Sequence, residues 1–315
     1  MMYEHIPVML KEAISFLNPK KGDFFVDCTL GGSGYTLELS RSVSDDGIVI
    51  SFDLDDLAIK NAEEIIKNQK IKNIILIKEN FRHLDKKINE LEKYQNQKFN
   101  GIVLDLGLSS AQLSDGNRGI SFKMDGPLNM AFGENQEVTT SEIINNWDQS
   151  EICKILRNYG EEKFANSIAH GIVSTREKKK ISTTGELVEI IRSSVPKKYL
   201  YSKIHFATRT FQALRIATND ELGALEEVLP QVISRLKSGG RCVVISYHSL
   251  EDRIVKNFFK EESKTCNCDK NQLVCNCENI QKIKLINKKV ILPSDEEIKK
   301  NPRARSAKMR VIEKI

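Results

Sequence analysis

Apolar residues in the first third of the chain follow two alternating patterns. Short runs rich in β-branched and aromatic residues occur at 24–27, 47–53, 73–80 and 100–107. Between them, at 55–69 and 83–94, apolar residues recur at helical spacing among charged ones, which predicts amphipathic helices. Strands that alternate with helices in this way are typical of a parallel sheet with crossover helices.

The pattern changes after residue 113. Residues 114–137 are rich in Gly, Asn, Asp and Pro, and residues 141–198 show helical periodicity without a strand signal. The first pattern then returns: a helix at 219–236, a strand at 241–247, a second helix near 250–259, and a last segment, 306–313, that alternates like an edge strand. We therefore expect an α/β domain made of residues 1–112 and 207–315, interrupted by a helical domain at 113–206.

A glycine-rich turn follows the first strand. That strand ends at Asp27, and the turn is Gly31-Gly32-Ser33-Gly34. Glycines here let the backbone bend sharply and approach a nucleotide-like ligand. The next strand ends in Asp53, about twenty residues further on, where an acid can receive ribose hydroxyls. The pair indicates a cofactor that contains a nucleoside.

Two cofactor classes compete for this turn. A dinucleotide requires G-x-G-x-x-G, but Tyr35 and Thr36 follow the turn with no third glycine in register. S-adenosylmethionine has no phosphate and tolerates the looser turn. In that case we expect Asp53 to hold the ribose, Asn80 and Phe81 to flank the adenine, and Asp105 to lie near the methionine end.

Length and composition describe an ordinary globular protein. The 315 residues are 40% hydrophobic, enough to bury a substantial core. The charged, proline-containing start and the lack of a long apolar run predict a cytoplasmic protein with no membrane partner. The net charge is only +5, but basic residues cluster at 176–180, at 196–198 and in the C-terminal tail. Such clusters fit a nucleic-acid partner and, equally, ordinary solvated faces.

The seven cysteines, with no secretion signal, argue against a disulfide framework. Four of them form two close pairs in the loop 264–280, Cys266 with Cys268 and Cys275 with Cys277. Two pairs of thiols in a polar loop can form a tetrahedral metal site, although zinc pairs more often have two or more intervening residues. A structural zinc site and a reduced, metal-free loop both remain open.

Longer motifs carry a family resemblance. They lie at 105–113, 118–122, 159–162, 207–222, 246–253 and 301–307. Together they resemble the RsmH (MraW) family of bacterial small-subunit ribosomal RNA cytosine-N4 methyltransferases, over nearly the whole chain. The resemblance implies a Rossmann-like S-adenosylmethionine-dependent methyltransferase sheet with an inserted helical, substrate-recognition domain. It also implies that a cytidine in the decoding region of 16S rRNA, in the small ribosomal subunit, accepts the methyl group.

The same resemblance implies cofactor positions. They fall on Ser33, Gly34, Tyr35, Asp53, Phe81, Asp105 and Gln112. The family usually has His where Tyr35 stands, which puts a side-chain contact in question. The usual acidic, arginine-bearing form of residues 127–132 is neutral here, so the loop around Asn129 has no assigned role.

The chemistry of the acceptor suggests further residues. The exocyclic amine of cytosine is a poor nucleophile because its lone pair is delocalised into the ring. The enzyme must hold that nitrogen in line with the sulfonium methyl and accept its hydrogen bonds as charge develops. Asp105 is the first candidate acceptor, and His248 is the second, as a proton relay. Tyr35, Phe122 or Tyr247 could accommodate a cytosine that has left its stack.

Arginines in the second half could bind RNA phosphates: Arg209, Arg215, Arg303 and Arg305. For each, an ordinary ion pair is the alternative. Three rival functions are a dehydrogenase, which the missing third glycine opposes, a non-catalytic RNA-binding assembly factor, and a methyltransferase acting on another RNA or a non-RNA substrate. The sequence leaves the oligomeric state open, and a homodimer is compatible with it.

Overall fold

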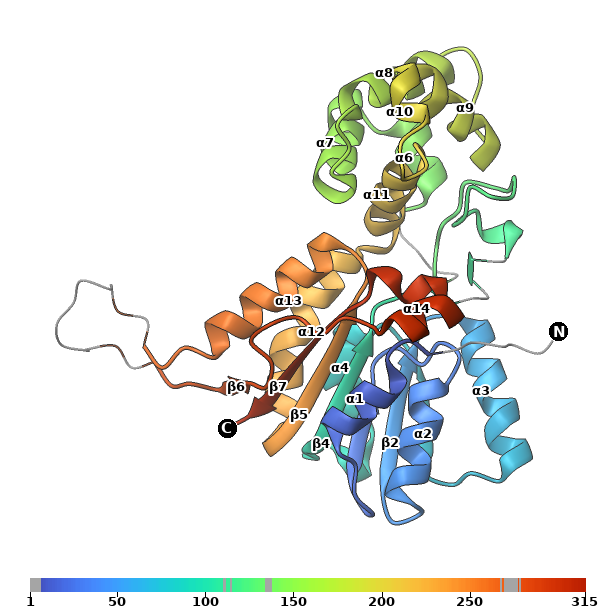
Figure 1. The fold of residues 1–315 in the computed structure, drawn as a ribbon. Helices are drawn as coiled ribbons and strands as arrows, with labels where there is room; N and C mark the ends of the chain where they lie inside the picture. The colour runs from blue at the N-terminus through green and yellow to red at the C-terminus, as the bar shows by residue number, and fades with distance from the viewer. Residues whose placement is uncertain are drawn as a thin grey trace. The chain divides into compact units, whose positions relative to one another are not determined.

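The computed structural model describes residues 7–109, 112, 113, 115–133, 138–266, 268, 277 and 279–315. The chain divides into two compact units, one of residues 1–108 and 222–315 and one of residues 109–221 (Figure 1). We call them the sheet unit and the helical unit. We expected the boundaries at 112/113 and 206/207. The observed second boundary comes later because α11 (Thr208–Asn219) packs against α7 (Gln149–Gly160) of the helical unit.

The first part of the sheet unit alternates strands and helices. Its elements are α1 (Leu10–Leu17), β1 (Phe24–Asp27), α2 (Gly34–Val43), β2 (Ile48–Asp53), α3 (Asp56–Gln69), β3 (Ile74–Lys78), η1 (Phe81–His83), α4 (Leu84–Glu90), η2 (Glu92–Tyr94) and β4 (Phe99–Asp105). After the helical unit come α12 (Glu221–Arg235), β5 (Leu236–Ser246), α13 (Ser249–Glu262), β6 (Ile283–Leu285), α14 (Asp295–Lys300), η4 (Pro302–Ser306) and β7 (Lys308–Lys314).

Within the described residues, seven strands form one sheet in the order β3-β2-β1-β4-β5-β7-β6. Strands β1 to β5 pair in parallel, and β7 runs antiparallel to both of its neighbours. The parallel sheet with crossover helices is therefore confirmed. Parallel pairing brings the carboxyl ends of β1 to β5 to one edge, where open α/β sheets bind their ligands.

The last strand is not an edge strand, and our prediction for 306–313 was wrong in this respect. β7 pairs with β5 on one side and β6 on the other. Its inner positions Met309, Val311 and Ile312 are buried. The edge is β6, which has only three residues, too few for a periodic pattern to reveal it.

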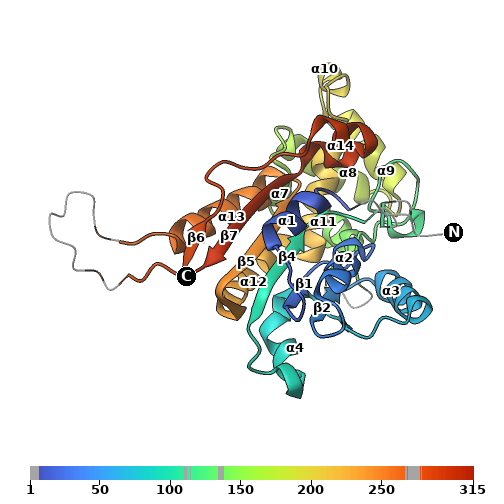
Figure 2. The ribbon, with the colours of Figure 1, turned by 60° about the horizontal axis from the view of Figure 1, so that its bottom comes forward.

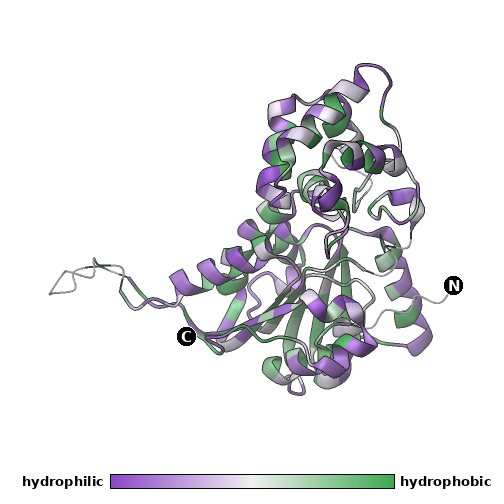
Figure 3. Ribbon diagram, turned by 45° about the horizontal axis from the view of Figure 1, so that its top comes forward, coloured by the Kyte–Doolittle hydropathy of each residue, from purple (hydrophilic) through white to green (hydrophobic). Residues whose placement is uncertain are grey.

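Apolar side chains cover both faces of the sheet. One face packs against α4, α12 and α13 through residues such as Ile88, Val228 and Phe259. The other packs against α1, α2 and η4 through Leu17, Leu39 and related residues. Helix α1 contacts β4 and β5 (Figure 2). Figure 3 shows the apolar residues concentrated on the strands, with polar residues on the outer turns of the helices.

The helical unit contains η3 (Gly116–Arg118), α6 (Thr140–Asn146), α7, α8 (Ala165–Arg176), α9 (Thr184–Ser194), α10 (Lys197–Leu200) and α11. Its core is formed where α7 packs on α8 and α11, and α8 on α9. Fully buried isoleucines and leucines line these contacts, among them Ile152, Leu156, Ile168 and Leu214. Among the described residues, no helix combines the length and apolar character needed to cross a bilayer.

Candidate active site

Three carboxylates end three adjacent strands. Asp27, Asp53 and Asp105 are the last residues of β1, β2 and β4, which lie side by side with β1 in the middle. Asp27 pairs with Ser51 and Val103, so Asp53 and Asp105 lie two residues further along the flanking strands. Asp27 is consequently the deepest of the three and is fully buried, whereas the other two are partly exposed.

Asp27 ties the strand to the turn that follows it. Its carboxylate accepts hydrogen bonds from the Thr29 amide (3.1 Å) and the Thr36 hydroxyl (2.7 Å). The Thr36 hydroxyl also lies 2.8 Å from that of Ser51 on β2. Burial raises the pKa of Asp27 to about 6, and these hydrogen bonds only partly oppose the shift. The group is therefore a structural anchor that costs stability when it ionises.

The glycine-rich turn is held by the second acid. The Gly31 amide donates to Asp53 Oδ2 (2.8 Å), and the Asp55 amide donates to Asp53 Oδ1 (2.9 Å). Gly31 and Ser33 adopt the left-handed backbone region, with φ of 46° and 66°. Burial raises the pKa of Asp53 to about 6. Each of its oxygens can accept one more hydrogen bond, which suits a ligand that carries a pair of hydroxyls.

Ser33 leaves a polar atom for a ligand to satisfy. Its side chain is 1% exposed, and among the described residues its hydroxyl oxygen has no hydrogen-bond partner. Unsatisfied buried hydroxyls are uncommon because each costs about 1–3 kcal/mol. Gly34, the next residue, begins α2, where backbone amides lack helical partners. The turn therefore has the polar groups that a bound nucleoside cofactor would engage.

Tyr35 plays a different part from the one expected of its side chain. Its hydroxyl donates to the Val8 carbonyl, and the residue is 3% exposed within the core formed with α1. The side chain therefore holds the backbone at Val8 and is packed in the core, so neither face of the ring is exposed to solvent. What remains for a cofactor is its backbone amide, in the first turn of α2.

Asp105 is oriented by Tyr247, which follows β5. The Tyr247 hydroxyl donates to Asp105 Oδ1 (2.8 Å), and the Asp105 amide donates to the Thr29 hydroxyl (2.7 Å). A Cβ on Gly107 would lie 2.6 Å from the Tyr247 ring, so only glycine lets the ring approach. Burial raises the pKa of Asp105 to about 7, and the charge of Asp27 adds to the shift.

Glu251 supports this arrangement, and the sequence analysis did not identify it. It is 3% exposed, and its Oε2 accepts hydrogen bonds from the amides of Tyr247 (2.8 Å) and His248 (3.2 Å). His248 Nδ1 accepts the Glu251 amide in return (3.4 Å), which completes a capping box at the start of α13. The His-x-x-Glu spacing was the available signal. In this structure His248 is a helix cap, with its Nε2 3.1 Å from Glu251.

Phe81 and Gln112, the other expected cofactor residues, lie in different units. Phe81 begins η1 just after β3, and Asn80 caps that turn by accepting the Arg82 amide (3.0 Å). Gln112 belongs to the helical unit, where it exchanges two hydrogen bonds with Ser109 (3.0 and 3.1 Å). The sheet unit therefore places Phe81 at the ligand edge of the sheet. Gln112 belongs to the helical unit, so the sheet unit does not position it.

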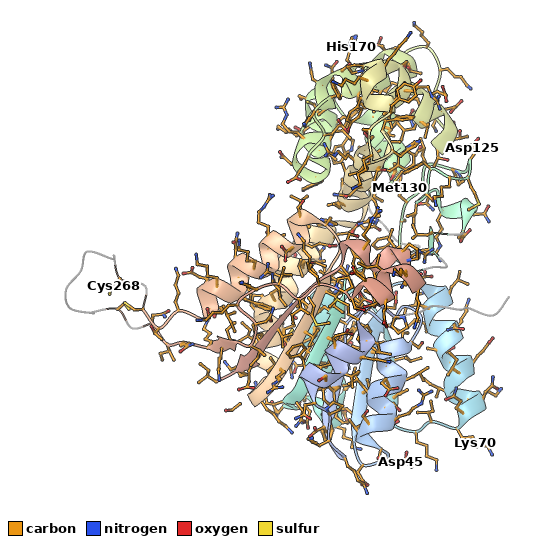
Figure 4. The ribbon with its side chains drawn as sticks, viewed as in Figure 1. Asp45, Lys70, Asp125, Met130, His170 and Cys268 are labelled. Atoms are coloured by element: carbon orange, nitrogen blue, oxygen red, sulfur yellow. The ribbon has the colours of Figure 1, made fainter. Side chains whose placement is uncertain are left out.

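A second residue that the sequence analysis missed, Asn219, holds the loop around Asn129. From the end of α11 its Nδ2 donates to the Met130 carbonyl (2.8 Å), and its Oδ1 accepts the Phe132 amide (2.9 Å). Figure 4 labels Met130 in this loop. Because Asn219 is 5% exposed, it is a buried clamp that gives the neutral loop a fixed conformation.

The predicted RNA-binding arginines have varied surroundings. Arg215 forms a bidentate ion pair with Glu221 (2.7 and 2.9 Å), and Arg209 donates to the Glu161 carbonyl (3.2 Å). Arg303 and Arg305 are exposed on η4. The ion pair explains Arg215 without RNA, so its phosphate contact stays a prediction.

The cysteine pairs lie away from these acids. The segment between α13 and β6 contains Cys266, Cys268 and Cys277. It lies at the β6 edge of the sheet, and β3 forms the other edge. Cys275 lies outside the described residues.

A glycine turn after β1 and carboxylates at the ends of β1, β2 and β4 define an α/β enzyme of the kind that binds a nucleoside cofactor at its strand ends. The chain belongs to the MraW methylase family, whose model matches residues 2–315.

Relatives resemble the chain from end to end. It is 44% identical to the ribosomal RNA small subunit methyltransferase H of Heliobacterium modesticaldum, over 100% of both chains. It is 45% identical to the protein of the same name from Clostridium botulinum strain 657, again over 100% of both. Among solved structures, an rRNA methylase from Streptococcus thermophilus has 11% identity, 98% coverage of both chains and a TM-score of 0.43. The family assignment rests on the first two comparisons and the family model.

Replacing Asp27 by Asn should stabilise the sheet unit at alkaline pH. The folded pKa of Asp27, about 6, lies above its ordinary value of 3.8, so the native state loses stability as pH rises from about 3.8 to about 6, and the loss is complete above this range. Asn cannot ionise, so we expect a gain of up to about 3 kcal/mol at pH 8, falling by about half at pH 5. Urea unfolding at both pH values measures it.

The matched control is Asp46→Asn, an exposed carboxylate paired with Lys21, which should change the free energy of unfolding little at either pH. Equal destabilisation of the Asp27 variant at pH 5 and pH 8 would contradict the assignment.

Proposed function

We propose that this methylase transfers the methyl group of S-adenosylmethionine to the exocyclic N4 amine of a cytidine in the decoding region of 16S rRNA. The small-subunit rRNA named for its relatives supports the class of acceptor. The observation that carries the chemistry is Asp105: a carboxylate at the ligand edge, oriented by Tyr247, with a pKa of about 7. Such a group can accept hydrogen bonds from an amine and bind its proton near neutral pH.

The residues present fit the donor. Asp53 keeps acceptor capacity for two ribose hydroxyls, and the buried Ser33 hydroxyl needs a partner that the described protein does not supply. Phe81 follows the adjacent strand, where an adenine would lie beside the ribose. When bound, the donor supplies an electrophilic methyl group on a sulfonium cation. The three strand-end carboxylates favour that positive charge.

The acceptor side is organised around one carboxylate oxygen. Tyr247 donates to Asp105 Oδ1, so Oδ2 is the atom we assign to the cytosine amine. Glu251 fixes the backbone of Tyr247 and thereby the direction of its ring. We expect Asp105 to accept a hydrogen bond from the amine as its nitrogen gains positive charge. His248 stays the second candidate. It directly follows Tyr247 in the chain and caps the start of α13.

The direct test is transfer of labelled methyl from S-adenosylmethionine to small ribosomal subunits that lack the modification, followed by nucleoside analysis. We expect label in N4-methylated cytidine. Asp105→Asn should lower the rate by two or more orders of magnitude, since a positioned acid or base typically contributes about 10²- to 10⁴-fold. Asp46→Asn is the matched control and should keep the wild-type rate. Donor binding without label in RNA would refute the acceptor, and a near-normal Asp105→Asn rate would remove that residue from the reaction.

Donor binding should depend on pH through Asp105. Its pKa of about 7 means that the carboxyl is largely protonated at pH 6 and ionised at pH 8. A sulfonium cation favours the ionised form, so affinity for S-adenosylmethionine should rise over this range by up to about tenfold. S-adenosylhomocysteine carries a neutral sulfur and should show a flatter profile. Titration calorimetry of both ligands at each pH measures the difference. The coupling would be contradicted if the affinities for the two ligands changed equally with pH. It would also be contradicted if Asp105→Asn kept the wild-type difference between their pH profiles.

Exposed rings on the helical unit support its role in substrate recognition. The half-buried Phe122 ring stacks on the exposed His205 ring, with centroids 4.5 Å apart and planes 12° apart, and His205 also stacks on Phe206. Partial burial lowers the pKa of His205 below its ordinary value, and the charge of Arg192 adds to the shift. Tyr201 is 87% exposed nearby in the chain, among Lys197, Lys198 and Lys203. Exposed rings among cations are what unstacked RNA bases bind.

Tyr201→Ala should weaken binding to unmodified small subunits by about tenfold, because stacking on one ring contributes about 1–3 kcal/mol. Donor affinity should stay unchanged. Ile280→Ala, a 79% exposed apolar residue of the sheet unit, is the matched control. Co-sedimentation of the labelled enzyme with the subunits measures the effect. Equal affinity of the Tyr201 variant and wild type would exclude this ring from the RNA surface.

A further inference from the structure

Three cysteine thiols converge in the segment between α13 and β6. The Sγ atoms of Cys266, Cys268 and Cys277 all lie within 4.8 Å of one another, and those of Cys266 and Cys277 are 3.6 Å apart. Figure 4 labels Cys268 beyond the ends of α13 and β6. Because β6 is the sheet edge opposite β3, the thiols are remote from the carboxylates on β1, β2 and β4. The proposed methyl transfer does not use them.

The spacing of the thiols matches metal coordination. In a tetrahedral site with Zn–S distances near 2.3 Å, neighbouring sulfurs lie about 3.8 Å apart. The observed 3.6 Å is close to this value and far from the roughly 2.0 Å of a disulfide. The Cys268 amide also donates to Cys266 Sγ (3.3 Å). Hydrogen bonds of this kind stabilise the charge of a ligating thiolate and fix its direction.

The base of the segment is closed by contacts that do not involve the cysteines. Asn279 Nδ2 donates to the Lys264 carbonyl (2.7 Å), and the Lys282 amide donates to the Glu262 carbonyl (3.1 Å). The Lys282 ammonium also pairs with Glu262 (2.8 Å). These contacts bring Cys266 and Cys277, eleven residues apart in the chain, to the same end of the closed base. Because the fold already holds the two ends of the segment together, metal binding loses less conformational entropy when it brings the thiols together.

We propose that Cys266, Cys268 and Cys277 bind a thiophilic divalent cation of the Zn²⁺ class as thiolates. Binding exchanges the three thiol protons for the metal, and those protons pass to solvent. Soft sulfur ligands select such a cation over Mg²⁺ or Ca²⁺. The sequence repeats the Cys-x-Cys spacing at Cys275 and Cys277, but Cys275 lies outside the described residues, and the proposal rests on the other three thiols. The metal would fasten the two ends of the segment and has a structural role, independent of the methyl donor.

The test uses the purified full chain under reducing conditions, first stripped of metal and then titrated with Co²⁺. Tetrahedral thiolate ligation gives Co²⁺ an intense near-ultraviolet charge-transfer band and visible d–d bands. We expect saturation at about one Co²⁺ per chain and displacement by Zn²⁺. Cys266→Ser and Cys277→Ser should each lose the charge-transfer band. Cys153→Ser, which removes a partly exposed cysteine on α7, is the matched control and should keep it.

Absence of the band in wild type would overturn the proposal, as would a full band in both Cys266→Ser and Cys277→Ser. Loss of the band in Cys153→Ser would also overturn it. Binding of S-adenosylhomocysteine is measured on every variant. Retained binding shows that the sheet unit is folded, and the readout does not depend on methyl transfer. Failure of the metal site and failure of the proposed function are thus distinguishable.

Discussion

The structure depends on placing carboxyl groups where water is largely excluded. In the strand register, Asp27 lies two residues before Asp53 and Asp105, and it holds Thr29, Thr36 and, through Thr36, Ser51. Without these bonds the turn after β1 would lack its connection to the sheet. Burial of this carboxyl raises its pKa and costs stability when it ionises. In return, the carboxylate holds the backbone of the turn that follows β1, next to the other residues of the ligand edge.

Precision at Asp105 comes from a chain of supports that ends in the start of a helix. Glu251 binds the backbone amide of Tyr247, and the Tyr247 hydroxyl directs the carboxylate of Asp105. Gly107 keeps clear the space that the ring occupies. Each support is a short, geometrically specific contact on a strand end or a helix cap, so the Asp105 carboxylate is positioned before any ligand binds. Such preorganisation is what lets a hydrogen-bond acceptor act on developing charge.

The sequence predicted the strand ends well because each acid directly follows an apolar run, so that a local pattern locates both strand and carboxylate. It could not predict partners that are distant in the chain. Asn219 clamps Met130 from 89 positions away, and Tyr247 reaches Asp105 from 142 positions away. The three residues of β6 are too few to show the alternation typical of a strand. The sequence therefore could not predict that β7 has a neighbouring strand on each side. The family resemblance placed Tyr35 at the cofactor, and only the packing shows that its hydroxyl binds the Val8 carbonyl.

These features also link binding to stability. Burial is the main cause of the raised pKa values of Asp27, Asp53 and Asp105, and the charge of Asp27 adds to the shift at the other two. In the protein without a ligand, ionisation of these carboxyls therefore costs stability. A cation bound at the same edge would lower that cost, and any ligand that binds only the native state stabilises it further by mass action. If the donor binds at these acids as we propose, its positive sulfonium is favoured over the neutral product by the ionised carboxylates, and the same electrostatics favour exchange of product for fresh donor.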